Sequence, residues 1–119
     1  MSESKARCSS GQLNTVCYSA PLHVFVCHCG ECQRRTGSAF GYQALFDENQ
    51  VKIMGKSKRY TQIGDNGFRV SFNFCPSCGS KVWYRAERAV QLVGIPAGAF
   101  ADASFYPPSK SIFESNKHP

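Results

Sequence analysis

The stretch CHCGEC, residues 27–32, places three cysteines within six residues in the pattern C-x-C-x-x-C. It follows the β-rich residues 22–26, so the three thiols stand at the end of a predicted strand. Such a pattern can direct three sulfurs at one ion, and three protein ligands leave the fourth tetrahedral position open to water or substrate. The stretch therefore predicts a zinc site of the open, catalytic kind. His28 is either a group that supports this site and carries protons or a side chain that points to solvent.

A second cysteine pair stands in Cys75-Pro76-Ser77-Cys78-Gly79. A C-x-x-C turn places two sulfurs on one side of a tight loop, about 2.3 Å from a shared tetrahedral zinc ion. Pro76 presets the turn, and Gly79 permits the backbone conformation that brings amide groups towards the thiolates. A redox role for C-x-x-C requires a neighbouring βαβ unit, which the sequence pattern does not indicate. The pair supplies only two ligands, so its partners must come from elsewhere in the chain.

Two cysteines lie outside these motifs. Cys8 stands near the N-terminus, and ligation together with the C-x-x-C pair would tie the first strand to the later hairpin. The alternative for Cys8 is a free, mobile thiol. Cys17 falls inside a β-rich run on the same face as Leu13 and Thr15, so we expect a small buried apolar side chain outside the metal sites.

A single structural zinc ribbon is a simpler alternative for the whole pattern. Its four ligands would be Cys29, Cys32, Cys75 and Cys78. The 42 intervening residues are more than a compact ribbon usually contains, and the arrangement leaves Cys8 and Cys27 without a role. We therefore favour two separate sites.

Length and composition indicate one domain over residues 1–119. A chain of 119 residues, 42% hydrophobic and 18% charged, can build a modest core that a metal staple would help to stabilise. The seven cysteines are an odd number, and no apolar run follows the N-terminus, so we expect a cytoplasmic protein with reduced thiols rather than disulfides. No apolar stretch approaches the roughly 20 residues that cross a bilayer.

The net charge of +6 fits small anionic substrates as well as it fits nucleic acid. The densest basic segment, Lys56-Ser57-Lys58-Arg59, is expected to form a solvated strand edge, where lysines discourage edge-to-edge pairing. The sequence contains no run of five like charges and no interleaving of aromatic residues with arginines. These features argue against nucleic acid as a partner.

The rest of the chain predicts short strands separated by turns. Residues 68–74 alternate apolar and polar at period two, and Asn66-Gly67 before them is a favoured hairpin dipeptide. No stretch of ten residues has helical periodicity, and only residues 31–36 could form a helical turn. The tail from Ala97 on is expected to be extended over the surface. Further strands are predicted at residues 13–18, 22–26, 39–46, 51–54, 57–63, 81–85 and 89–93. The predicted fold class is all-β: a compact, zinc-pinned fold of short twisted antiparallel sheets with little helix.

The order of the motifs resembles a known family. The segments are Cys27-His28-Cys29-x-x-Cys32-x-Arg34-x-Thr36-Gly37-Ser38-Ala39-Phe40 and Phe74-Cys75-Pro76-x-Cys78-Gly79-Ser80. They resemble the glutathione-dependent formaldehyde-activating family, which also includes the domain of animal centromere protein V. The resemblance spans most of the chain, from Cys8 to about Phe113.

The resemblance implies a compact β fold with two zinc ions per chain. It assigns Cys27, Cys29 and Cys32 to the catalytic zinc. It assigns the structural zinc to Cys8, Cys75 and Cys78. Members of the family are described as carbon–sulfur lyases that act on S-hydroxymethylglutathione, with the thiol of glutathione at the open zinc position.

We therefore expect a zinc-dependent carbon–sulfur lyase-type enzyme, similar to S-(hydroxymethyl)glutathione synthase, whose partner is glutathione or another small thiol. Arg34 and Arg35, just past the first motif, could bind glutathione carboxylates through bidentate contacts, or they could belong to an exposed turn. The alternative function is a non-catalytic zinc-binding module that binds thiol ligands or nucleic acid.

Two positions depart from the family pattern. The family usually has C-x-C near the N-terminus, whereas this chain has Cys8-Ser9-Ser10, so the structural site lacks its fourth sulfur. Ser10, water or another residue must then complete the site, and we expect weaker metal retention there because a neutral hydroxyl is a poor zinc ligand beside thiolates. Ser111 stands where many relatives carry histidine, which puts a substrate contact from the tail in doubt.

Overall fold

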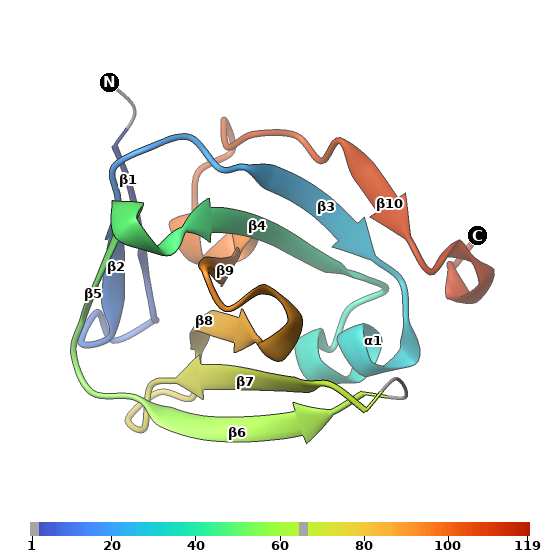
Figure 1. Ribbon diagram of the computed structural model, residues 1–119, viewed down its shortest axis with the longest axis horizontal. Helices are drawn as coiled ribbons and strands as arrows, with labels where there is room; N and C mark the ends of the chain where they lie inside the picture. The colour runs from blue at the N-terminus through green and yellow to red at the C-terminus, as the bar shows by residue number, and fades with distance from the viewer. Residues whose placement is uncertain (1–2, 65–66) are drawn as a thin grey trace.

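The computed structural model describes residues 3–64 and 67–119. These residues form two β-sheets and one short α-helix, which confirms the predicted all-β fold class (Figure 1). The smaller sheet is antiparallel, has the order β1-β2-β5, and consists of β1 (Ser4–Arg7), β2 (Asn14–Cys17) and β5 (Val51–Met54).

The larger sheet has seven strands in the order β10-β3-β4-β9-β8-β7-β6. Adjacent strands of this sheet are antiparallel, except that β10 runs parallel to β3. The strands are β3 (His23–Cys27), β4 (Gly41–Asp47), β6 (Lys58–Ile63), β7 (Arg69–Phe74), β8 (Lys81–Ala86), β9 (Leu92–Pro96) and β10 (Lys110–Ile112). The helix α1 spans Gly30–Thr36, and the 3₁₀ turns are η1 (Glu48–Gln50), η2 (Glu87–Ala89), η3 (Ala97–Phe100) and η4 (Glu114–Asn116).

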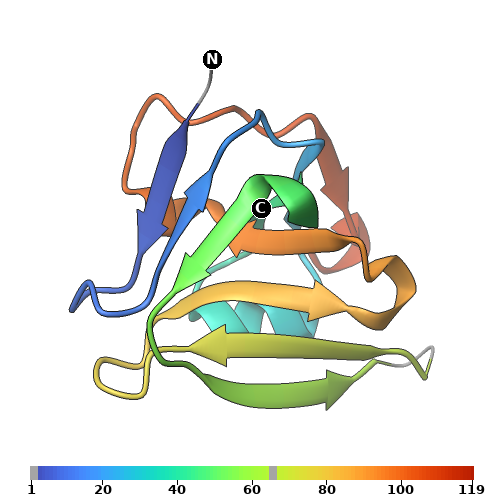
Figure 2. The ribbon, with the colours of Figure 1, turned by 60° about the vertical axis from the view of Figure 1, so that its left-hand side comes forward.

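The main core lies where the two sheets meet. The small sheet crosses the direction of β6, β7 and β8 in both views of the ribbon (Figures 1 and 2). Phe46 from β4 is fully buried there, and its ring lies 6.0 Å from that of Phe100 in η3. Burying a side chain of this size stabilises the fold by about 1.5–3 kcal/mol. The buried members of the cluster are Ala6, Cys17, Val24, Ala44, Phe46, Val93, Ile95 and Phe100.

Most predicted elements have counterparts in the structure. The expected helical turn is α1, and the expected solvated strand edge is β6, which is the outermost strand of the large sheet. The Asn66-Gly67 turn falls partly outside the described residues, because Asn66 is not among them. The strand predicted at 89–93 is displaced: η2 ends at Ala89, and β9 begins only at Leu92.

The expectation of an extended surface tail was wrong in part. The tail contains η3, η4 and β10, and β10 pairs with β3 along the edge of the large sheet. Ser109 donates its N–H to the carbonyl of Val24, and Ile112 accepts the N–H of His28. These bonds exist because the edge of β3 offers unpaired backbone groups, a tertiary effect that local sequence does not reveal.

Gly55 lets the end of β5 approach the loop between β1 and β2. Its φ is +100°, and a Cβ atom there would lie 1.9 Å from the carbonyl oxygen of Gln12. The approach is fixed by Lys56, whose N–H donates to Oε1 of Gln12 at 2.9 Å. Only glycine combines this backbone conformation with so short a distance.

We predict that Gly55→Ala destabilises the protein more than Gly67→Ala does. Gly67 also has positive φ (+83°), but a Cβ there would meet no heavy atom of the described chain within 4 Å. Both variants should lose about 1–2 kcal/mol to backbone strain, and Gly55→Ala should lose a further 1–3 kcal/mol, roughly, to the clash. Urea unfolding followed by circular dichroism would measure both losses. Equal losses would show that the close approach to Gln12 is absent.

Candidate metal centres

The first sulfur group forms where β3 passes into α1. Cys27 is the last residue of β3, Cys29 is the N-cap of α1, and Cys32 lies in the first helical turn. Their three Sγ atoms all lie within 4.8 Å of one another. The cap itself uses sulfur, because Cys29 Sγ accepts the N–H of Cys32 at 3.3 Å. Gly37, in the left-handed conformation, ends the helix by donating its N–H to Gln33.

The three thiols have different acidities. Burial raises the pKa of Cys27 to about 12, and it also raises the pKa of Cys32, where Arg35 opposes the shift. At Cys29 burial acts in the same direction, but hydrogen bonds from the backbone and the thiols of the group outweigh it and lower the pKa. Three thiolates this close together, two of them on buried residues, would repel one another, and a bound cation would offset that repulsion.

The second sulfur group joins the loop after β1 to the turn between β7 and β8. The Sγ atoms of Cys8, Cys75 and Cys78 lie within 4.8 Å of one another. The turn closes as the C-x-x-C pattern predicts: Gly79, with φ +81°, donates its N–H to the carbonyl of Cys75 at 2.8 Å. Cys8 is therefore not a free, mobile thiol, because it is fully buried and accepts the N–H of Leu13 at 3.3 Å.

Hydrogen-bond donors surround the sulfurs of this second group. Cys75 is buried, which raises its pKa, but donors that include Gln12 Nε2 at 3.2 Å outweigh burial and bring the pKa to about 7. Backbone N–H groups of Ser80 and Ser10 lower the pKa of the exposed Cys78 to about 5. Gln12 was not predicted, since nothing in the sequence distinguishes it from any other polar loop residue.

Both groups fit a thiophilic divalent cation such as zinc. Each offers three thiol sulfurs that converge on one point, which is the donor set that zinc prefers. The two C-x-x-C pairs fall into different groups, so the arrangement does not support a single ribbon. Cys17 belongs to neither group in the described structure. It is fully buried, as expected, and burial raises its pKa to about 11.

The two candidate arginines have different surroundings. Arg34 is exposed and pairs with Glu31 at 2.8 Å, as expected for a residue of an exposed turn. Arg35 lies over the ring of Phe72, 4.5 Å from its centroid, and its Nη2 donates to Cys32 Sγ at 3.5 Å. The structure therefore brings only Arg35 to the first sulfur group.

A cavity of about 390 Å³ is lined by residues that contact both groups, although none of the six clustered cysteines lines it. Of its lining residues, Arg35 donates to Cys32 Sγ, and Ser80 Oγ lies 3.6 Å from Cys78 Sγ. Gln43 is 3% exposed, and within the described residues its Oε1 has no hydrogen-bond partner. Lining residues include Arg35, Tyr42, Gln43, Ser80, Lys81 and Pro96.

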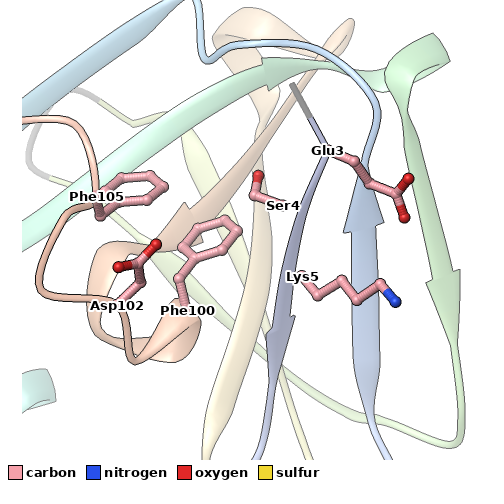
Figure 3. Close-up of a pocket in the computed structure, with 6 residues that line it drawn as sticks. All are labelled: Glu3, Ser4, Lys5, Phe100, Asp102 and Phe105. Carbon is pink, nitrogen blue, oxygen red and sulfur yellow. The ribbon is translucent and has the colours of Figure 1, made fainter. Parts of the chain in front are cut away.

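A second cavity, of about 360 Å³, lies between β1 and the chain around η3 (Figure 3). None of the six clustered cysteines lines it; its walls are Glu3, Ser4, Lys5, Phe100, Asp102 and Phe105. Unlike Arg35 and Ser80 in the first cavity, no residue that lines it makes a described contact with a clustered sulfur.

His28 is buried rather than solvent-facing. Its ring packs edge-on against Phe40 at 5.6 Å, and its Nε2 lies 2.9 Å from the Oγ of Ser111. Of the residues described, none offers a hydrogen-bond partner to its Nδ1. His28 and Ser111 thus join the end of β3 to β10 beside the first sulfur group. The hydroxyl of Ser111 is therefore engaged with His28 of the same chain.

Across residues 3–64 and 67–119, no helix has the length and apolar character needed to traverse a bilayer. The only α-helix of this part of the chain has seven residues.

A family model described as glutathione-dependent formaldehyde-activating enzyme matches residues 3–116. A search of curated proteins finds no match. A crystal structure of a Rhodobacter sphaeroides protein is similar in fold, with a TM-score of 0.63 and 17% sequence identity over 90% of this chain and 98% of that chain. The family match covers nearly the whole length, and the sulfur groups contain the cysteines on which the sequence resemblance rests. The chain belongs to the glutathione-dependent formaldehyde-activating enzyme family.

Proposed function

We propose that the chain is a single-domain enzyme that makes and breaks the carbon–sulfur bond between glutathione and formaldehyde. The observation that carries the proposal is the convergence of Cys27, Cys29 and Cys32, of which Cys32 accepts a hydrogen bond from Arg35, a residue that lines the 390 Å³ cavity. These three cysteines would hold a catalytic zinc ion, and Cys8, Cys75 and Cys78 a second one. The seven free cysteines suit a reducing compartment, and we propose the cytoplasm.

The reaction is an addition without oxidation or reduction. The sulfur of the thiol forms a bond to the carbonyl carbon, and the thiol proton ends on the former carbonyl oxygen. The reverse reaction breaks the carbon–sulfur bond and returns that proton to sulfur. A zinc ion bound by the three cysteines would supply a low-pKa thiol and an electrophile for the carbonyl oxygen.

The side chains of the cavity would orient the anionic tripeptide. Arg35 and Lys81 line the same space and bring two positive charges, which suit the carboxylates of glutathione. The stacking on Phe72 holds the guanidinium of Arg35 in place before a ligand arrives, which lowers the entropy lost on binding. Arg34, paired with Glu31 at the surface, has no such role.

The proposal predicts that the protein accelerates exchange between glutathione, formaldehyde and their adduct. Exchange NMR would compare the rate with the spontaneous background, because thiols add to formaldehyde without help. Cys32→Ser should return the rate to background while the β fold persists by circular dichroism. A wild-type rate equal to background, with thiol binding retained, would favour the non-catalytic binding module instead.

Metal content gives a separate prediction. Elemental analysis of untagged protein should find about two zinc ions per chain, and Cys32→Ser should reduce this to about one because only the first group loses a ligand. The matched control is Cys17→Ala, which removes a buried cysteine that belongs to neither group. The control should retain both ions. Loss of zinc from Cys17→Ala, or its retention in Cys32→Ser, would contradict the ligand assignment.

Arg35→Met should raise KM for glutathione by roughly tenfold or more, since a charge-assisted contact to a carboxylate is worth about 1.5–3 kcal/mol. The matched control, Arg34→Met, removes the neighbouring charge and should change KM by less than about twofold. Steady-state kinetics at several glutathione concentrations would test both variants. An equal effect of the two substitutions would indicate a general charge effect rather than binding by Arg35.

A further inference from the structure

The group of Cys8, Cys75 and Cys78 carries a hydroxyl at the position of a missing fourth sulfur. We propose that Ser10 fills this fourth position only weakly, so that a small-molecule thiol can displace it and bind at a second site. The inference rests on the zinc ligation proposed above and does not depend on the proposed activity.

The distances place the Ser10 hydroxyl where a fourth ligand would stand. With zinc–sulfur bonds of about 2.3 Å and a zinc–oxygen bond of about 2.0–2.2 Å, a tetrahedral site separates sulfur from oxygen by about 3.5–3.7 Å. Ser10 Oγ lies 3.3 Å from Cys8 Sγ and 3.6 Å from Cys75 Sγ. The second separation equals that of a shared tetrahedral centre, and the first is shorter by only a few tenths of an ångström.

The chemistry of Ser10 makes it a replaceable ligand. A neutral hydroxyl binds zinc less strongly than a thiolate does. In addition, the backbone N–H of Gln12 donates to Ser10 Oγ at 3.4 Å and therefore draws on the same lone pairs that a metal would need. An incoming thiolate has neither disadvantage.

The burial pattern leaves this corner open to solvent. Cys8 and Cys75 are buried, whereas Ser9, Ser10 and Cys78 are exposed, so the protein covers one side of the group and not the other. A thiol can therefore reach the fourth position without displacing a buried side chain.

A positive charge lies beside the loop. Arg7 Nη1 donates to the carbonyls of Cys8 and Ser9, each at 3.1 Å, which places the guanidinium next to the loop that carries Ser10. Three thiolates and a zinc ion carry a net charge of −1, and a fourth thiolate makes it −2. The guanidinium would reduce the cost of that extra charge.

The exchange involves no electron transfer. With a metal held by the three cysteines, the incoming sulfur would take the place of Ser10 Oγ as fourth ligand, and the proton of the thiol would pass to solvent. The proposed ligand is any small thiol, and it does not need to carry a carboxylate.

The test counts the thiols that bind to protein loaded with two equivalents of cobalt(II), whose absorption spectrum reports sulfur ligation. The probe is 2-mercaptoethanol, which lacks carboxylates and so does not depend on Arg35. Wild type should bind two thiols per chain, and Ser10→Cys should bind one, because the new sulfur already occupies the fourth position. Ser9→Cys is the matched control: it adds a thiol one residue away, and it should still bind two.

Ser10→Asp provides a second variant should Ser10→Cys fail to fold. Its carboxylate is a stronger zinc ligand than a hydroxyl and should also reduce the count by one. A count of one in wild type and none in Ser10→Cys would support this inference while removing support for the proposed catalytic site. Counts that are the same in wild type, Ser10→Cys and Ser10→Asp would overturn the inference and leave the proposed function standing.

Discussion

The convergence of thiols from segments far apart in sequence is the constraint on which this small fold depends. Cys8 lies beside Cys75 and Cys78, so the first hairpin and the β7–β8 turn must meet at one point. A cross-link over a loop of this length removes about 4 kcal/mol of chain entropy from the unfolded state, by the loop-closure relation. The same point is packed by a small apolar cluster that contains Leu13 and Val82. A metal ion held by these three thiols would act together with this minor core.

The first sulfur group imposes a different constraint, because its three cysteines are close in sequence. Cys27 is placed by the pairing of β3 with β4, and Cys32 by the first turn of α1. Cys29 links the two elements by capping the helix with its own sulfur. The group thus depends on a strand end and a helix start meeting at a fixed angle. On the other edge of β3, the contact of His28 with Ser111 and the pairing with β10 hold that strand in place.

The features of this structure that depend on residues close in sequence could be predicted, whereas the contacts between distant segments could not. The cysteine spacings, the short helix and most strands were predictable, because turns, apolar alternation and ligand spacing are local signals. The pairing of β10 with β3 was not, since a three-residue exposed strand has no distinctive pattern. The sequence offered no basis for choosing between Arg34 and Arg35 as a ligand-binding residue. The structure distinguishes them, because the Arg34 side chain pairs with Glu31 and the Arg35 side chain contacts Cys32. Lys81 and Gln43 reach the cavity from strands whose neighbours no local pattern reveals.

The surroundings of the two sulfur groups, rather than their number of thiols, decide what each can do. Both have three thiols, yet the first is linked to the cavity by a cation, Arg35, that contacts one of its sulfurs, whereas the second is linked by a neutral hydroxyl, Ser80. If the proposed function holds, binding energy from the remote parts of the tripeptide would be available at that group, as catalysis requires. The second group is fixed by backbone amides and faces solvent through Ser10, so a ligand there meets few groups that could orient it. The same thiol chemistry would consequently give directed reaction at one group and simple exchange at the other.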